Sequence, residues 1–126
     1  MHSFPYDATY EPPLPIAEVE LKATAGARTV SLTAIIDTGA DATIVPTAWL
    51  EQINARPVLE AHLRSQWGER RQVFLYLVDV TIASIVLSGM SVVGDNLGDE
   101  VVLGRDVLNR LRLQLDGPAK VTRLLG

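Results

Sequence analysis

The stretch TVSLTAIIDTGADATIVP, residues 29–46, decides the fold, because it brings a carboxylate to the end of an apolar strand. Residues 29–36 alternate between polar and apolar and end in Ala-Ile-Ile, a pattern that predicts a strand running into the core. Asp37-Thr38-Gly39 then predicts a tight turn, since glycine lets the backbone fold closely. Desolvation and hydrogen bonds at such a position shift a carboxyl pKa, so Asp37 is a candidate catalytic residue.

The alternative interpretation of this triplet is an ordinary β-turn closed by an aspartate side chain. Asp-Thr-Gly arises by chance in about a few percent of chains of this length, so the triplet needs support from its surroundings. Residues 42–46 (ATIVP) predict a short strand directly after it. Residues 16–23 (IAEVELKA) alternate before it, and a glycine-containing turn joins them to residues 29–36. The triplet therefore ends a predicted hairpin.

Further short elements are expected on both sides of this hairpin. Four prolines among residues 1–15 predict an extended N-terminal arm, followed by one domain over residues 16–126. Residues 48–54 carry apolar side chains at helical spacing and predict at most two helical turns. Residues 58–82 predict two long strands that form a projecting hairpin, with its tip near Trp67 and Gly68.

The last third of the chain predicts strands, one loop and one short helix. Residues 85–100 predict one or two strands and a Gly-Asp-Asn loop, and residues 101–117 predict strand, turn at Gly104, helix and strand. Asp106 is the expected N-cap of that helix. Many short strands with glycine and proline turns indicate an all-β barrel or sandwich.

Composition excludes several classes of protein. The chain has 126 residues, 48% of them hydrophobic, which suits one globular domain. Its net charge of −4 with scattered basic residues predicts no nucleic-acid partner and no anionic membrane partner. Without cysteine there are no disulfides, and His2 and His62 are too far apart in sequence to predict a metal site. The first residues lack a signal peptide, so a cytoplasmic location is expected.

A second motif, VVLGRDVLNRL at residues 101–111, gives the triplet its context. Together the two motifs resemble the retropepsins, the retroviral-type aspartic proteases, in the form of a single-domain bacterial-type member. That family has an apolar-Asp-Thr/Ser-Gly-Ala-Asp run, followed by an apolar-apolar-Gly-Arg-Asp/Asn-apolar-Leu run before a C-terminal helix. The resemblance covers residues 16–117 and implies a small closed acid-protease barrel with a flap hairpin and one or two short helices.

The resemblance also implies roles for individual residues. Asp37 matches the catalytic aspartate, and Thr38 and Gly39 match the rest of the active-site loop. Substrate-binding positions are implied for Ala40, Asp41, Trp67 and Gly68. Asp41 and Arg105, with Gly104 beside them, are interpreted as structural support, because arginine fixes a carboxylate and holds two loops in register. The alternative for this pair is an ordinary surface ion pair.

One Asp-Thr-Gly triplet implies a homodimer. Aspartic protease chemistry needs two carboxylates that share a proton, and a two-fold axis supplies the second Asp37. The expected substrate is a polypeptide, and no cofactor or metal is expected. The N-terminal arm or residues 119–126 are candidates for the dimer interface, with their strand pairing left open. The alternatives are a partner chain bearing a different aspartate and a non-catalytic dimeric peptide-binding module on the same fold.

Overall fold

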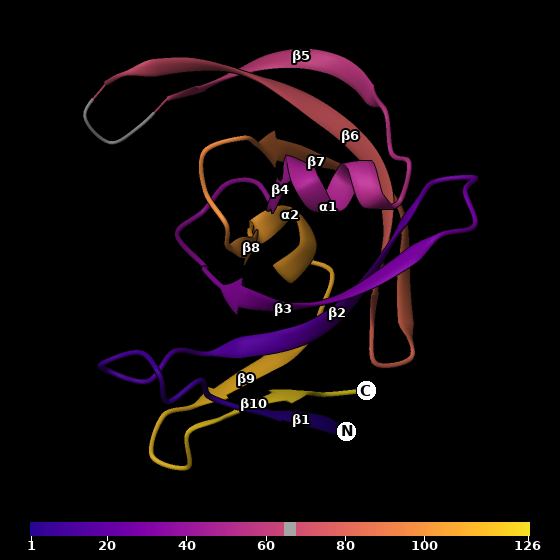
Figure 1. Cartoon of the computed structure of the whole chain (residues 1–126). Helices are drawn as coiled ribbons and strands as arrows, with labels where there is room; N and C mark the ends of the chain where they lie inside the picture. The colour runs from indigo at the N-terminus through magenta and orange to yellow at the C-terminus, as the bar shows by residue number, and fades with distance from the viewer. Residues whose placement is uncertain (65–67) are drawn as a thin grey trace.

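A closed β-barrel forms the body of the computed structural model, which describes residues 1–64 and 68–126 (Figure 1). In chain order the elements are β1 (His2–Pro5), β2 (Ile16–Ala23), β3 (Thr29–Ile36), β4 (Ile44–Pro46), α1 (Thr47–Gln52), β5 (Pro57–Arg64), β6 (Arg70–Ile82), β7 (Ile85–Asp95), β8 (Val101–Leu103), α2 (Arg105–Leu108), β9 (Leu113–Asp116) and β10 (Val121–Leu124). Within the described part of the chain, six strands pair in the order β2-β3-β8-β4-β7-β6, and β6 pairs again with β2. The expected all-β closed barrel with two short helices is confirmed.

The interior of the barrel is apolar because side chains alternate between buried and exposed along its strands. Val19 and Leu21 of β2 are buried, whereas Glu18 and Glu20, which alternate with them, are exposed. Leu21 lies opposite Val80 of β6, which is also fully buried. Because successive side chains of a strand point to opposite faces, each strand presents one apolar face to the interior. Burying one such side chain contributes about 1.5–3 kcal/mol.

Strand β8 joins the two sequence motifs at the centre of the barrel. It runs parallel to β3, with Ile36 opposite Leu103, and it touches β4 through the antiparallel pair of Ile44 and Val102. Ile36 and Leu103 are both buried. The chain after β3 and the chain after β8 therefore leave the barrel side by side.

The hairpin of β5 and β6 projects from the barrel, as expected. Among the described residues β5 pairs only with β6, and Figure 1 shows the hairpin arching over β7 and α1. Gly68 lies beside the tip with φ +82°, a left-handed conformation that favours glycine. Trp67, the other expected tip residue, lies outside the described residues.

The two chain ends form a separate three-stranded sheet in the order β1-β10-β9. His2 of β1 pairs with Leu124 of β10, and Phe4 and Leu124 are buried. Only residues 2–5 of the expected extended arm form a strand, and the chain turns back on itself between Asp7 and Leu14, which pair in an antiparallel bridge. The pairing of β1 with the C-terminal strand of the same chain was not anticipated. The division of the chain at residue 15 stays a prediction.

Both helices are short. Leu50 of α1 and Ile53 directly after it belong to the apolar residues expected at helical spacing in residues 48–54, and both are buried in the core. The prediction that Asp106 caps the second helix is wrong: Gly104 occupies the N-cap position and Asp106 is the second helical residue. Of the helices in the described residues, none has the length and apolar character needed to cross a membrane.

Candidate active site

Asp37 sits at the mouth of the barrel, directly after β3. Its backbone N–H donates to the carbonyl oxygen of Leu103 at 3.1 Å, so the pairing of β3 with β8 continues to this residue. The N–H of Gly39 donates to Oδ1 of Asp37 at 2.9 Å, and the N–H of Ala40 donates to the Asp37 carbonyl at 3.2 Å. These bonds fix the turn and hold one carboxylate oxygen in place.

The candidate active-site loop, residues 37–41, faces outward in the single chain. Asp37, Thr38 and Gly39 are all exposed, and Ala40 is half-buried. One side of the Asp37 carboxylate is therefore accessible from outside the chain. A group from outside this chain, either substrate or a second protein, has access to it.

The segment after β8 supports the chain around this loop through hydrogen bonds. The N–H of Arg105 donates to the Ala40 carbonyl at 2.9 Å. Thr43, which is fully buried, donates from its hydroxyl to Oδ1 of Asp106 at 2.7 Å, and its N–H donates to Oδ2 at 3.2 Å. The same hydroxyl accepts from the N–H of Gly104 at 3.1 Å. Asp106 is therefore a brace between the two motifs rather than a helix cap.

Gly104 permits this close packing because it has no side chain. A Cβ atom there would lie 2.5 Å from the carbonyl carbon and oxygen of Ala42. Its φ of −92° is open to any residue, so space and not backbone conformation selects glycine. The two loops can approach to this distance only with glycine at position 104.

Asp41 and Arg105 form an ion pair across the two loops, as expected. The side chains are 89% and 49% exposed, respectively. Exposed ion pairs contribute about 0–1 kcal/mol, so this pair orients the loops more than it stabilises the fold. It also turns the second carboxylate of the motif toward Arg105.

We expect Asp106→Asn to lower the free energy of unfolding by about 1–2 kcal/mol. The amide oxygen of asparagine replaces only one of the two acceptors that Thr43 uses, and the NH₂ group then faces a donor. Asp41→Asn is the matched control, with an expected loss under about 1 kcal/mol because its ion pair is exposed. Chemical denaturation of both variants measures the difference, and equal losses would contradict the bracing role of Asp106.

A second ion pair ties the hairpin of β5 and β6 to the barrel. Nη2 of Arg71 in β6 lies 3.2 Å from Oδ1 of Asp95, at the end of β7. Burial raises the pKa of Asp95, but hydrogen bonds from the N–H groups of Leu97 and Gly98 and the charge of Arg71 outweigh it, so the net pKa is lowered. Asp95 therefore stays ionised at neutral pH and keeps the hairpin attached to the loop before β8.

Most of the residues named from the sequence meet at this site. The loop after β3 and the adjoining start of α2 carry Asp37, Thr38, Gly39, Ala40, Asp41, Gly104 and Arg105. Gly68 lies on the projecting hairpin. In the described part of the chain, no group of three or more histidine, aspartate or glutamate residues is placed to hold a metal ion.

Sequence reasoning missed Thr43 and misjudged Asp106. The available signal was a hydroxyl residue at the edge of an apolar run, because a buried threonine needs a hydrogen-bond partner. The identity of that partner was not readable, since Asp106 lies far away in sequence.

Comparison with protein families shows the family of the chain. The family model described as gag-polyprotein putative aspartyl protease matches residues 23–110, which is more than half of the chain. The chain belongs to this family. The matched range of this retropepsin-like aspartic protease family includes residues 37–41 and the Gly104-Arg105 turn that supports them.

Solved structures agree with the family. A retropepsin-like aspartic protease from Rickettsia conorii superposes with a TM-score of 0.67 at 12% identity, covering 98% of this chain and 90% of that one. The EIAV protease in complex with an inhibitor gives 0.63 at 19% identity, covering 77% and 86%. The simian foamy virus (mac) protease gives 0.53 at 26% identity, covering 74% and 91%. No curated protein sequence matches this chain.

These similarities establish that the fold is that of a retropepsin-like aspartic protease. At 12% and 19% identity, these similarities show that the strands are arranged alike, but they do not show that the chemistry is shared. The chemistry has to be argued from Asp37 and its surroundings.

Proposed function

We propose that this chain is one subunit of a homodimeric aspartic endopeptidase, with Asp37 of each copy forming the catalytic pair. The observation that carries the proposal is the single Asp37 carboxylate, fixed by Gly39 yet exposed on one side. A second copy related by a two-fold axis supplies the other carboxylate, and such pairing is the commonest symmetry of soluble oligomers.

The proposed reaction is hydrolysis of a peptide bond by a water molecule held between the two Asp37 carboxyl groups. The ionised carboxylate takes a proton from water, and the resulting hydroxide attacks the scissile carbonyl carbon. The protonated partner donates its proton to the carbonyl oxygen. Two such groups about 3 Å apart share one proton because both cannot be ionised cheaply. The tetrahedral intermediate then collapses: the carboxyl group that took the proton from water gives it to the leaving amide nitrogen, and the C–N bond breaks. The other carboxylate takes a proton from one hydroxyl of the intermediate as the new carboxyl group forms.

In this proposal the other named residues hold the pair and the substrate. Thr38 and Gly39 meet their counterparts across the axis, and Ala40 and Asp41 lie beside the substrate. The hairpin that carries Trp67 and Gly68 acts as a flap: an extended peptide adds as a strand to its backbone. Closing the flap excludes water from the reacting bond.

The test is peptide cleavage as a function of protein concentration. Purified protein is incubated with a mixed peptide library at several pH values between ~3 and 8, because the proposed reaction needs one protonated and one ionised carboxyl group. We expect the activity per chain to fall on dilution, in step with the dimer fraction from analytical ultracentrifugation. Activity per chain that stays constant while the dimer dissociates would contradict the shared site. A stable dimer that cleaves no peptide would favour a non-catalytic peptide-binding module.

A further inference from the structure

A cavity of about 390 Å³ is lined in part by Ile35, near the end of β3. We call it the acidic pocket and define it by six of its lining residues, which are Asp7, Tyr10, Ile35, Trp49, Asp99 and Glu100. They come from the N-terminal segment, β3, α1 and the loop before β8. The volume lies within the range of about 300–1,000 Å³ that is usual for pockets that bind small groups.

The pocket adjoins Asp37 through the strand that carries it. Ile35 precedes Asp37 by two residues, or roughly 7 Å at about 3.3 Å per residue. Ile36 between them is buried in the core, and Asp37 continues the strand pairing with Leu103. Side chains of a strand alternate between faces, so Ile35 and Asp37 project to the same side. Val101, which pairs with Ala34, lines the same pocket.

The lining of the pocket carries negative charge. Asp7, Asp99 and Glu100 line it, and its described lining includes neither lysine nor arginine. A hydrogen bond from the Thr9 hydroxyl, helped by the Thr9 N–H, lowers the pKa of Asp7 and keeps it ionised. The Tyr10 hydroxyl donates to Glu100, and this bond raises the pKa of Tyr10, so the phenol keeps its proton.

Several of the other lining residues are apolar. Ile16 and Leu32 are buried, and Ile35 and Trp49 are half-buried. A long basic side chain fits such a lining, because its methylene stem packs on apolar surface while the charged head stays near carboxylates. The guanidinium of arginine also stacks on an indole face and binds carboxylates through two parallel hydrogen bonds.

We propose that the acidic pocket selects a basic side chain, with arginine preferred over lysine, at a substrate position close to the scissile peptide bond. The inference rests on the proposed protease function and names the substrate class of that same site. Glu100 and Asp99 are the specificity-determining carboxylates in this proposal.

The experiment compares matched peptides that differ at one position. Each cleaved library peptide that contains arginine is resynthesised with citrulline, which keeps the shape and removes the charge. We expect kcat/KM of the wild-type dimer to be at least about tenfold higher for arginine, the effect of hydrogen bonds between charged groups. Glu100→Gln should reduce this ratio several-fold, and Asp99→Asn serves as a second variant should the first fold poorly.

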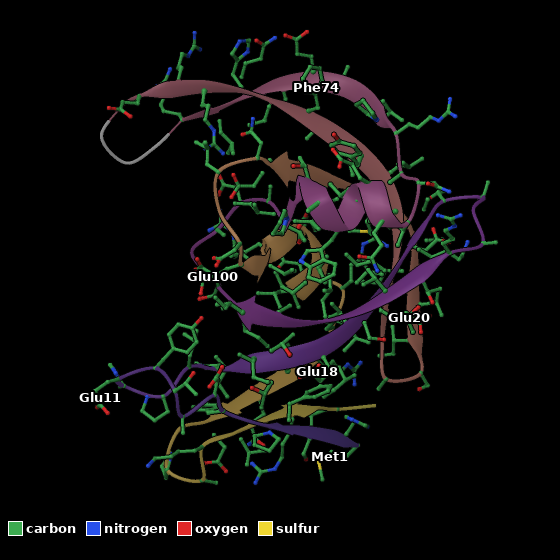
Figure 2. All side chains as sticks on the ribbon, viewed as in Figure 1. Met1, Glu11, Glu18, Glu20, Phe74 and Glu100 are labelled. Atoms are coloured by element: carbon green, nitrogen blue, oxygen red, sulfur yellow. The ribbon has the colours of Figure 1, made fainter. Side chains whose placement is uncertain are left out.

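Glu20→Gln is the matched control, since it removes the same charge from an exposed residue on β2. Figure 2 labels Glu20 and Glu100 on opposite sides of the barrel, and Glu20 does not line the pocket. Its arginine-to-citrulline ratio should equal that of the wild type. Cleavage with no basic preference, or a preference that survives both pocket variants, overturns the inference and leaves the protease function standing. Absence of cleavage of every peptide overturns the protease function and this inference with it.

Discussion

Asp37→Asn is expected to lower kcat/KM for peptide cleavage about a thousandfold or more, while the protein stays folded and dimeric. Asparagine has nearly the same shape as aspartate, and its amide oxygen still accepts the hydrogen bond from the Gly39 N–H. It has no carboxylate to take the proton from water. Kinetics on the library-derived peptides, with ultracentrifugation alongside, measures both parts of the prediction.

Mixing the Asp37→Asn variant with wild type tests whether one site uses both copies. With random pairing, activity per wild-type chain falls to about one half at equal amounts and about one quarter at a threefold excess of variant. The chains must be dissociated and re-associated together so that mixed dimers form. Unchanged activity per wild-type chain would show that each subunit acts alone and would overturn the shared catalytic pair.

Gly104→Ala is expected to lower the free energy of unfolding by about 3 kcal/mol or more, near the upper end for overpacked sites. The added Cβ would lie 2.5 Å from backbone atoms of Ala42, which cannot rotate away as a side chain can. Moving this backbone also displaces the active-site loop and the Thr43 brace. Peptidase activity should therefore fall even where the variant remains folded. Thermal or denaturant unfolding and peptide kinetics report the two effects separately.

Gly117→Ala is the matched control for that substitution. Gly117 lies in the turn between β9 and β10, and a Cβ atom there would meet no atom within 4 Å. Its unfolding free energy should change by less than about 1 kcal/mol. A similar loss in both variants would mean that chain flexibility, and not the contact with Ala42, makes glycine necessary at position 104.

The elements of the barrel were readable from local patterns. Strands β2 and β3 alternate clearly, and the Asp-Thr-Gly turn follows directly, so the hairpin and the position of Asp37 were predictable. The arginine at position 105 and the aspartate at position 41 were also paired correctly. This ion pair was predicted from the family resemblance of the two motifs. The two residues lie too far apart along the chain for a local pattern to predict it.

The errors share a single physical cause. Asp106 lies two residues after Gly104 and directly before the apolar residues Val107 and Leu108, a local pattern that predicts an N-cap. In the folded chain Thr43 presents a hydroxyl and an N–H to the same carboxylate, and those partners determine its position. Strands β1 and β10 escaped notice in the same way, because each is only four residues long and they pair across the whole chain.

The sequence by itself determined the strand-rich class, the hairpin that delivers Asp37 and the two motifs that mark the family, because each depends on neighbouring residues. Tertiary structure alone decided how the motifs support each other through Gly104, Thr43 and Asp106. It also assembled the acidic pocket from residues that lie as far apart in sequence as Asp7 and Glu100. Such contacts arise from strand pairing and barrel closure, which bring distant segments together without leaving a pattern in either one.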